Sequence, residues 1–207
     1  MGTNLIYIKN IRNASCFIFF VLVSCSVMGQ AKQKKQLTPA DYHLWSTMES
    51  TCISKTGLWV SYGLHYNSDK DTLFVRRNDG KKTYSYPLGA RGKFCDDSWF
   101  ACSNGKDMSL TNLKNGKLEV FAAVSDYEFS SNGKYLFVFS RAVDNRKMLT
   151  IRNLLNGTTE VVENISCWRF NSDKTMLAYG VQNESGVSAT VISFQNTIER
   201  MVQLPFT

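Results

Sequence analysis

The stretch Phe129-Ser-Ser-Asn-Gly-Lys-Tyr-Leu-Phe-Val138 decides the fold, because its pattern recurs along the chain. It begins with an apolar residue, continues through a polar turn and ends in residues that favour strands. The same order is found in Ile53–Tyr62, Phe94–Cys102 and Phe170–Tyr179. Counted along the sequence, the first residues of the four stretches lie 41, 35 and 41 positions apart. The sequence therefore predicts four repeats with a period of about 40 residues.

Two further features follow in each repeat. A short strand is predicted around each of four apolar residues, which are Leu73, Leu110, Ile151 and Ile192. Three of these strands lead into a dipeptide typical of hairpins, namely Asp79-Gly80, Asn115-Gly116 and Asn156-Gly157, whereas the fourth repeat has Asn196-Thr197. Such dipeptides between two strand-forming runs favour a two-residue type I′ turn, which needs a positive φ at both central residues. We therefore expect a hairpin at each of the three glycines.

Several short strands and turns in each repeat are typical of a β-propeller blade. The predicted fold class is all-β, a partial β-propeller of about four four-stranded antiparallel blades. The predicted blades cover residues 51–90, 91–126, 127–167 and 168–207. Another all-β arrangement, such as a β-sandwich, is the alternative, although a sandwich need not repeat over so long a period.

The composition agrees with a folded, exported domain. Of the 207 residues, 43% are hydrophobic and 13% aromatic, which provides a sizeable core and excludes a disordered chain. The net charge of +7 comes from basic residues that are scattered along the sequence. Because a nucleic-acid-binding protein usually gathers its positive charge on one face, we expect no nucleic-acid partner.

Residues 1–29 have the three parts of a signal peptide. Lys9 and Arg12 form the basic region, and an apolar run from about Ala14 to Val23 follows, which is too short to span a bilayer. Small residues then favour cleavage between Gly29 and Gln30. We therefore expect an exported protein, located in the periplasm or outside the cell.

A second processing route is open at the same segment. Leu22-Val23-Ser24-Cys25 resembles a bacterial lipobox, in which Cys25 would be lipidated and become the first residue of the mature chain. In that case a lipid on Cys25 would hold the protein at the outer membrane. We expect contact with a membrane only through such an anchor.

Residues 30–50 are interpreted as a leader with a short amphipathic helix. Thr38 suits the N-cap and Pro39 the first helical position, and Asp41 completes a start that resembles a capping box. Tyr42, Trp45 and Met48 would then share one face. We expect that face to pack against the repeats.

Four cysteines follow the signal segment, at Cys52, Cys95, Cys102 and Cys167. In an exported chain they allow three sets of pairings, among which the sequence does not choose. Cys95 and Cys102 are close enough in sequence to bridge a hairpin, or they can remain free and buried. Both alternatives stay open at this point.

The sequence contains no pattern that indicates catalysis. It has no Gly-x-Ser-x-Gly, no Gly-rich phosphate loop and no cysteine or histidine pair at metal-ligand spacing. Its two histidines, His43 and His65, are interpreted as structural residues. We therefore predict no catalytic residue, no cofactor and no metal site in this chain, so that it is not an enzyme by itself.

Two other groups of residues also favour structural roles. Asp96 and Asp97 stand where the other repeats have a polar turn, so we interpret them as turn residues rather than paired catalytic carboxylates. Trp59 and Trp99 occupy core positions of predicted strands, which favours packing over sugar binding.

Three segments resemble a known family. Residues 35–45 (KQLTPADYHLW), 53–62 (ISKTGLWVSY) and 70–75 (KDTLFV) look like the N-terminal region of exported prolyl oligopeptidase family (S9) serine peptidases of the Bacteroidetes type. The resemblance covers roughly residues 35–195. It implies a propeller that covers an α/β-hydrolase domain and restricts entry to peptides.

The chain also departs from that family. Nothing in it corresponds to the hydrolase domain with its Ser-Asp-His triad, and the family's propeller has more than four blades. No catalytic residue of the family can therefore be carried over to this sequence. We expect a non-catalytic fragment of an S9-like peptidase, whose partners would be peptide substrate or the missing hydrolase domain. The alternative is a free-standing propeller that acts as a binding scaffold outside the cytoplasm.

Overall fold

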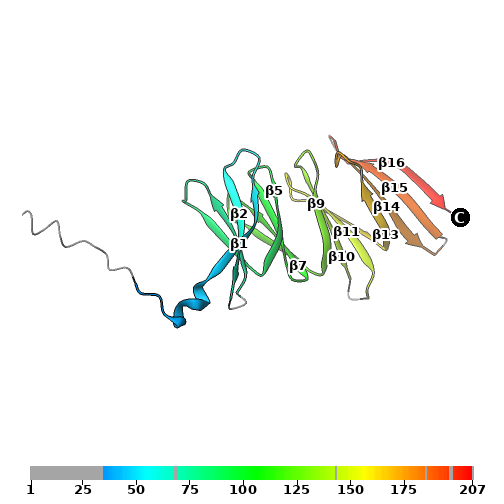
Figure 1. The fold of residues 1–207 in the computed structure, drawn as a ribbon. Coiled ribbons are helices and arrows are strands. Elements are labelled where there is room, and N and C mark those ends of the chain that lie inside the picture. Colours follow the sequence, from blue (N-terminus) through cyan, green and yellow to red (C-terminus); the bar gives the residue numbers. More distant parts are fainter. Residues whose placement is uncertain (1–34, 68–69, 143, 185, 196–197, 207) are drawn as a thin grey trace, which may run out of the picture. The chain divides into compact units, whose positions relative to one another are not determined.

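The computed structural model describes residues 35–67, 70–142, 144–184, 186–195 and 198–206. Within these residues the chain forms one short 3-10 helix, η1 (Pro39–Leu44), and sixteen β-strands (Figure 1). The strands form four antiparallel sheets of four strands each, and every sheet pairs its strands in chain order. This confirms the predicted all-β fold of four four-stranded blades.

The sheets are numbered 1 to 4 along the chain. Sheet 1 consists of β1 (Ser46–Ile53), β2 (Trp59–Tyr66), β3 (Thr72–Arg77) and β4 (Thr83–Pro87). Sheet 2 consists of β5 (Gly89–Cys95), β6 (Trp99–Asn104), β7 (Asp107–Asn112) and β8 (Leu118–Phe121). Sheet 3 consists of β9 (Val124–Phe129), β10 (Tyr135–Arg141), β11 (Lys147–Asn153) and β12 (Thr159–Glu163). Sheet 4 consists of β13 (Ile165–Phe170), β14 (Met176–Asn183), β15 (Gly186–Ser193) and β16 (Glu199–Phe206).

Each sheet has two apolar faces, because alternate residues of a strand point to opposite sides. We call the side toward the earlier sheet the preceding face and the side toward the later sheet the following face. In sheet 3, Leu136 and Val138 lie on the preceding face, in a cluster with sheet 2, and Phe137 lies on the following face, in a cluster with sheet 4. A near-continuous apolar strand such as β10 is therefore a strand buried on both sides.

Three hydrophobic clusters join consecutive sheets. Trp59, Leu73 and Val75 of sheet 1 pack with Phe100 and Cys102 of sheet 2. The second cluster joins sheets 2 and 3 and contains Ala101, Met108, Leu110, Tyr127, Phe129, Leu136 and Val138. The third joins sheets 3 and 4 and contains Tyr135, Phe137, Phe139, Leu149, Ile151, Leu177, Tyr179, Ile192 and Phe194. Trp59 is buried and Trp99 packs against the second cluster, which confirms the packing role predicted for both.

The strand pairing corrects the register that the sequence suggests for the third strand of the end sheets. Leu110 and Ile151 pair with Ala101 and Phe137 and face the following sheet. The third residue of each second strand defines one level of the sheets, and in sheets 1 and 4 this residue is Ser61 and Ala178. Ser61 pairs with Val75 and Ala178 pairs with Val191. Val75 and Val191, rather than Leu73 and Ile192, are therefore equivalent to Leu110 and Ile151. A spacing match that is wrong by one or two residues changes either the face or the level of a strand residue.

The three predicted hairpins at Gly80, Gly116 and Gly157 are present, with a different turn from the one expected. Each of these glycines has a positive φ, between 73° and 80°, but the Asp or Asn before it does not. Asn112 instead accepts hydrogen bonds from the amides of Lys114 and Asn115 through its side chain, and its carbonyl accepts one from Gly116. The loops are therefore longer than a two-residue type I′ turn, and a side chain stabilises them.

The leader differs from the expected amphipathic helix. Its start is as predicted, because the Asp41 carboxylate accepts hydrogen bonds from the backbone amide and the hydroxyl of Thr38. The helix ends at Leu44, however, and the chain enters β1 at Ser46, inside the segment assigned to the leader. Tyr42, Trp45 and Met48 are 48%, 49% and 65% exposed, so that they form no buried helical face. The sheet pairing with β2 is the stronger interaction for residues 46–49.

Ion pairs from the glutamates of outer strands also join consecutive sheets. Arg152 on β11 lies 2.9 Å from Glu119 on β8, between sheets 3 and 2. Arg200 on β16 pairs with Glu160 on β12, between sheets 4 and 3. In both pairs the arginine lies on the later sheet and the glutamate on the earlier one.

Candidate binding site at the ends of the first strands

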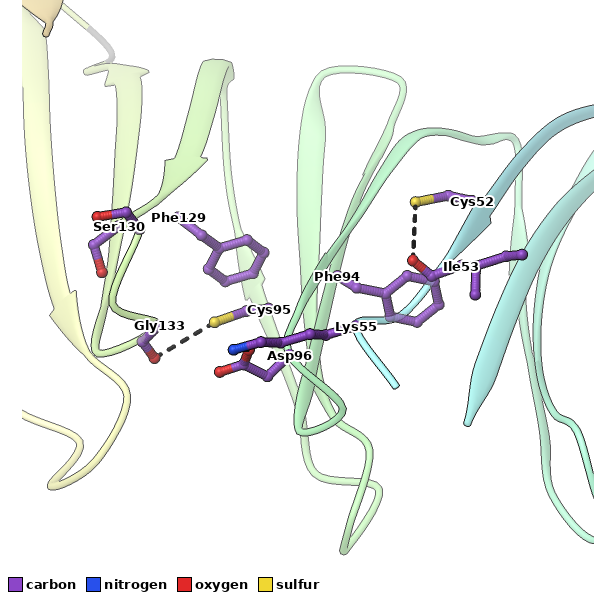
Figure 2. A pocket seen from close by; sticks show the side chains of 10 residues that line it. Cys52, Ile53, Lys55, Phe94, Cys95, Asp96, Phe129, Ser130 and Gly133 are labelled. Atoms are coloured by element: carbon purple, nitrogen blue, oxygen red, sulfur yellow. Dashed lines mark hydrogen bonds and ion pairs between the residues drawn. The ribbon is translucent and has the colours of Figure 1, made fainter. Parts of the chain in front are cut away.

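A cavity of about 320 Å³ lies where the first strands of sheets 1, 2 and 3 end (Figure 2). Its walls come from three stretches far apart in sequence, one from each sheet. The lining residues are Cys52, Ile53, Lys55, Phe94, Cys95, Asp96, Phe129, Ser130, Ser131 and Gly133. The repeat itself therefore builds this site.

The apolar wall consists of the residues that open the repeats. Ile53 and Phe129 are the last residues of β1 and β9, and Phe94 is the penultimate residue of β5. Phe129 is buried, Phe94 is half-buried and Ile53 is 66% exposed, so that the wall runs from the core to solvent. It offers a hydrophobic contact surface to a side chain that enters from outside.

The polar turns after these strands are held by side chains. The hydroxyl oxygens of Ser54 and Ser130 each accept a hydrogen bond from a backbone amide at 3.0 Å, from Trp59 and Tyr135 respectively. Asn171 accepts one from the amide of Met176 in sheet 4, at 2.9 Å. These bonds close the turn before the second strand begins.

Cys95 occupies the same place in sheet 2 but acts differently. Its thiol donates to the carbonyl oxygen of Gly133, with 3.4 Å between the two atoms, and so links sheet 2 to the turn of sheet 3 (Figure 2). Burial, together with the neighbouring Asp96 carboxylate, raises the pKa of Cys95 to about 12. At neutral pH this residue is a thiol, which is a poor nucleophile.

Gly133 brings the turn of sheet 3 close to Asp96. It has a φ of 69°, and a Cβ atom on it would lie 2.9 Å from Oδ2 of Asp96. Asp96 also has a positive φ, of 49°, and its carboxylate lies 3.1 Å from the ammonium group of Lys55. The rim of the cavity therefore combines a cation, a carboxylate and backbone groups.

Asp96 and Asp97 are turn residues, as predicted. Asp97 accepts a hydrogen bond from the hydroxyl of Ser54, which joins the turns of sheets 1 and 2. This bond holds the pKa of Asp97 below its ordinary value. The two carboxylates have separate partners and do not form an acid–base pair.

The two histidines lie away from this cavity. His65 on β2 has its Nδ1 atom 2.6 Å from Asp71, which precedes β3, and its Nε2 atom 3.2 Å from Glu49 on β1. His43 lies in η1. Neither is among the residues that line the cavity.

The sheet faces on which the thiols lie decide between a Cys95–Cys102 bridge and free, buried thiols. Cys95 packs in the cluster between sheets 2 and 3, and Cys102 in the cluster between sheets 1 and 2. They are therefore on opposite faces of one sheet. All four cysteines after the signal segment are free thiols.

The residues singled out for processing, Cys25, Gly29 and Gln30, lie outside the described residues. The cavity was not predicted from the sequence. Its signal was nevertheless present, because its apolar wall is made of the residues that open three repeats. These residues lie close together because of how the sheets are arranged in space. The spacings of 41 and 35 residues in the sequence do not predict that arrangement.

Two further observations concern metals and membranes. Among the described residues, no cluster of three or more His, Cys, Asp or Glu side chains is placed to bind a metal ion. No helix in the described part of the chain has the length and apolar character needed to cross a membrane.

Comparison with known proteins gives similarity in structure only. No family model matches the sequence, and no curated protein matches it. The propeller domain of the trilobed protease from Pyrococcus furiosus is 10% identical over 76% of this chain and 57% of its own, with a TM-score of 0.47. Acylaminoacyl peptidase from Pyrococcus horikoshii is 10% identical over 78% of this chain and 33% of its own, with a TM-score of 0.46. TolB from Acinetobacter baumannii is 14% identical over 75% of this chain and 42% of its own, with a TM-score of 0.42. The chain thus spans about half the length, or less, of these structures.

Proposed function

We propose that this chain is a non-catalytic propeller portion of an exported, S9-like serine peptidase, in which it admits and orients peptide substrate. The motifs that resemble that family lie in the described leader and in sheet 1, at residues 35–45, 53–62 and 70–75. Peptide substrate and a hydrolase domain outside this sequence are the partners that the proposal implies.

The cavity at the ends of the first strands carries the proposal. It combines an apolar wall with hydroxyl groups, backbone groups and one Lys–Asp pair, which together suit an extended peptide with an apolar side chain. Cys95, its buried thiol, is protonated at neutral pH, and Lys55 is held by Asp96. These groups favour binding over bond cleavage.

Peptide binding is tested by titrating the purified chain with short proline-containing peptides and following backbone amide resonances. We expect the amides at Ile53, Cys95 and Ser131 to shift. Ile53→Asp should weaken binding at least about fivefold, because it places a charge on the exposed end of the apolar wall. Leu155→Asp is the matched control, since Leu155 is 74% exposed and does not line the cavity. Shifts confined to other sheets, or equal affinity for both variants, would contradict the proposal.

The absence of catalysis is a separate expectation. The purified chain should hydrolyse neither amide nor ester substrates above the rate in buffer. Turnover that a serine-reactive phosphonate abolishes would show that the chain carries its own nucleophile and would overturn the non-catalytic role.

A free-standing binding scaffold remains the second candidate, favoured by the lipobox-like Leu22-Val23-Ser24-Cys25. The two candidates differ in the DNA that follows the codon for Thr207. Sequence there that encodes more blades and then Gly-x-Ser-x-Gly supports the peptidase. Labelling of the chain with palmitate, lost in Cys25→Ser, would support the anchored scaffold, whereas unlabelled protein beginning at Gln30 would exclude the anchor.

A further inference from the structure

The outer strand of sheet 1 lacks an acidic residue that the outer strands of sheets 2 and 3 carry. Glu119 on β8 and Glu160 on β12 stand at one level of the sheets, and Tyr84 on β4 occupies the equivalent position, because the three residues pair with equivalent residues of the third strands. Each glutamate forms an ion pair with an arginine of the next sheet, and Glu119 also lies 3.2 Å from Lys117. Sheet 1 therefore has no carboxylate at the place where sheets 2 and 3 neutralise basic side chains.

The hairpin loop of sheet 1 is also built differently from the loops of sheets 2 and 3. In those sheets an asparagine ends the third strand, Asn112 in β7 and Asn153 in β11, and its side chain accepts hydrogen bonds from two amides of the loop. Arg77 ends β3 at the equivalent place, since all three residues pair with the first residue of the second strand. Asp79 closes this loop instead, by accepting a hydrogen bond from the amide of Lys81 at 3.0 Å. The side chain of Arg77 is thus not needed to close the turn.

Arg77 lines a second cavity, of about 430 Å³, between sheets 1 and 2. Lys82 and Lys114 line it as well, one from the hairpin loop of each sheet, and we call this space the basic cavity. It shares Asp96 with the cavity at the ends of the first strands. Basic side chains from both sides of one junction therefore line a single cavity.

The basic cavity holds more positive charge than its neighbours neutralise. The ammonium group of Lys82 lies 5.0 Å from the centre of the Tyr84 ring, which stands in the place of the glutamate. In the described part of the chain, neither Lys82 nor Lys114 forms an ion pair. The Nε atom of Arg77 is buried and donates no hydrogen bond, although a carboxylate oxygen of Asp79 lies 3.4 Å away. Two ammonium groups and one guanidinium nitrogen are thus left to hold an acceptor from outside.

Two carboxylates line the basic cavity, and both have partners. Asp96 lies 3.1 Å from the ammonium group of Lys55, and Asp97 accepts a hydrogen bond from the hydroxyl of Ser54. They reduce the positive potential of the cavity without cancelling it. Two fixed negative charges repel a dianion more strongly than a monoanion. The cavity therefore favours a carboxylate over a phosphate.

Apolar side chains adjoin the three cations. Trp59 and Leu113 are buried in the wall of the basic cavity, and Leu58 is exposed at its opening. An inorganic ion would use only the charged part of this lining. A carboxylate attached to an aliphatic side chain would also cover Leu58, because a binding site of mixed character matches a ligand with a polar group and an apolar body.

We propose that the basic cavity binds the carboxylate of an apolar ligand, with Arg77, Lys82 and Lys114 as the groups that hold the charge. Two sources share this chemistry, the C-terminal residue of a peptide and a free organic acid. The inference goes beyond the proposed function and does not depend on it, because the two cavities have only Asp96 in common.

The first test titrates the purified chain with N-acetyl-L-leucine and with N-acetyl-L-leucinamide, which lacks the charge. We expect the backbone amides of Leu58, Lys82 and Lys114 to shift with the acid, and the amide to bind at least about tenfold more weakly. Added salt should weaken binding of the acid but not of the amide. Equal binding of the two compounds, tighter binding of inorganic phosphate at the same ionic strength, or no shift at these amides would overturn the proposal.

Variants locate the charge. Lys82→Gln and Lys114→Gln should each weaken binding of N-acetyl-L-leucine at least about threefold, because each removes one cation and keeps the length of the side chain. Lys117→Gln is the matched control, since the carbonyls of Lys117 and Lys82 accept the same loop hydrogen bond and Lys117 is already paired with Glu119. Tyr84→Glu introduces the glutamate of sheets 2 and 3 and should weaken binding at least about tenfold. Thermal melting of each variant checks that the fold is retained, and equal effects of Lys82→Gln and Lys117→Gln would contradict the site.

A peptide distinguishes the two sources. A proline-containing peptide that ends in leucine is titrated as the free acid and as the C-terminal amide, with the natural chain, Ile53→Asp and Lys114→Gln. If a peptide is the source, the acid binds more tightly than the amide, and both substitutions weaken it. If Lys114→Gln weakens binding of the acid and Ile53→Asp does not, the basic cavity binds a carboxylate and the proposed peptide site fails. If Ile53→Asp weakens binding and the acid and the amide bind equally, the proposed function stands and the carboxylate site is overturned.

Discussion

The guanidinium group of Arg152 lies 2.9 Å from the carboxylate of Glu119, and both side chains are largely buried between sheets 3 and 2. Lys117 also lies 3.2 Å from the same carboxylate. Burial opposes ionisation of Glu119, but the hydrogen bonds from Lys117 and Arg152 outweigh it and hold its pKa below the ordinary value. The pair therefore stabilises the junction of two sheets only while Glu119 is charged.

Removing the arginine should destabilise the protein. We expect Arg152→Leu to lower the free energy of unfolding by about 1–3 kcal/mol, because it leaves a partly buried carboxylate with one partner fewer. Urea denaturation at pH 7 measures the loss. Arg141→Leu, on the exposed end of β10, is the control and should change stability by less than about 0.5 kcal/mol. Equal losses for the two variants would contradict a stabilising role of the pair.

The same pair predicts a pH dependence. A carboxyl group with a lowered pKa in the folded state contributes stability above its unfolded pKa of about 4.3, and that stability is lost as the pH falls through the folded pKa. Stability of the natural chain should therefore fall below about pH 4.3 more steeply than that of Glu119→Gln. Parallel curves for the two chains between pH 5 and about pH 2 would show that Glu119 is not the group responsible.

The stability lost when an equivalent core residue is shortened should depend on how deeply its sheet face is buried. Leu136→Ala opens a cavity between sheets 2 and 3 and should cost about 2–5 kcal/mol. Val60→Ala, at the equivalent position on the half-buried preceding face of sheet 1, should cost about 1 kcal/mol. Chemical denaturation at low protein concentration provides both values. A loss at Val60 as large as that at Leu136 would mean that another part of the protein buries this face.

Gly133 offers a test of the junction beside the cavity. Gly133→Ala should destabilise the chain by about 1–2 kcal/mol more than Gly105→Ala. Both glycines have a φ near 70°, but a Cβ at Gly133 meets Asp96 at 2.9 Å, whereas nothing lies within 4 Å of one at Gly105. The backbone strain is thus common to both variants, and thermal unfolding reports the steric difference. Identical melting temperatures would show that the Asp96 side chain moves away freely.

Thiol reactivity should follow burial. Burial raises the pKa of Cys102 to about 12, as it does for Cys95, whereas Cys167 on β13 is exposed. An aromatic disulfide reagent at pH 8 should therefore modify Cys167 rapidly and Cys95 and Cys102 only on unfolding. Cys167→Ser should remove the fastest phase and leave the slower reaction of the half-buried Cys52. Rapid labelling of Cys95 would contradict its burial between sheets 2 and 3.

The sequence predicted the sheets well because their signals are local. An apolar run with a turn on either side, such as Tyr135–Arg141, is enough to indicate a strand buried on both faces, and the glycine at each hairpin is required by its positive φ. The helix expected to continue past Leu44 was wrong because pairing with β2 is a contact between residues distant in sequence. Matching Ile192 with Leu110 and Ile151 was wrong for the same reason, since only the partner strand shows that Val191 is the equivalent residue.

Less of the candidate site than of the fold could be predicted from the sequence. Cys95 has the same position in its repeat as Ser54 and Ser130, and nothing in its neighbours indicates that its thiol reaches the carbonyl of Gly133. The distance between the Cys95 thiol and the Gly133 carbonyl depends on how closely the turns of sheets 2 and 3 approach each other. The turn of sheet 2 is the shorter one, which contributes to this distance. A repeat predicts which residues are equivalent, but not where the equivalence is broken.

Each internal sheet packs one apolar face on its predecessor and the other on its successor. A gene that gains or loses a whole unit of about 40 residues therefore gains or loses both faces together, and each remaining sheet keeps an apolar face for its new neighbour. Growth and shortening by duplication or deletion are tolerated in such a chain, whereas a substitution in one blade alters the fit of two.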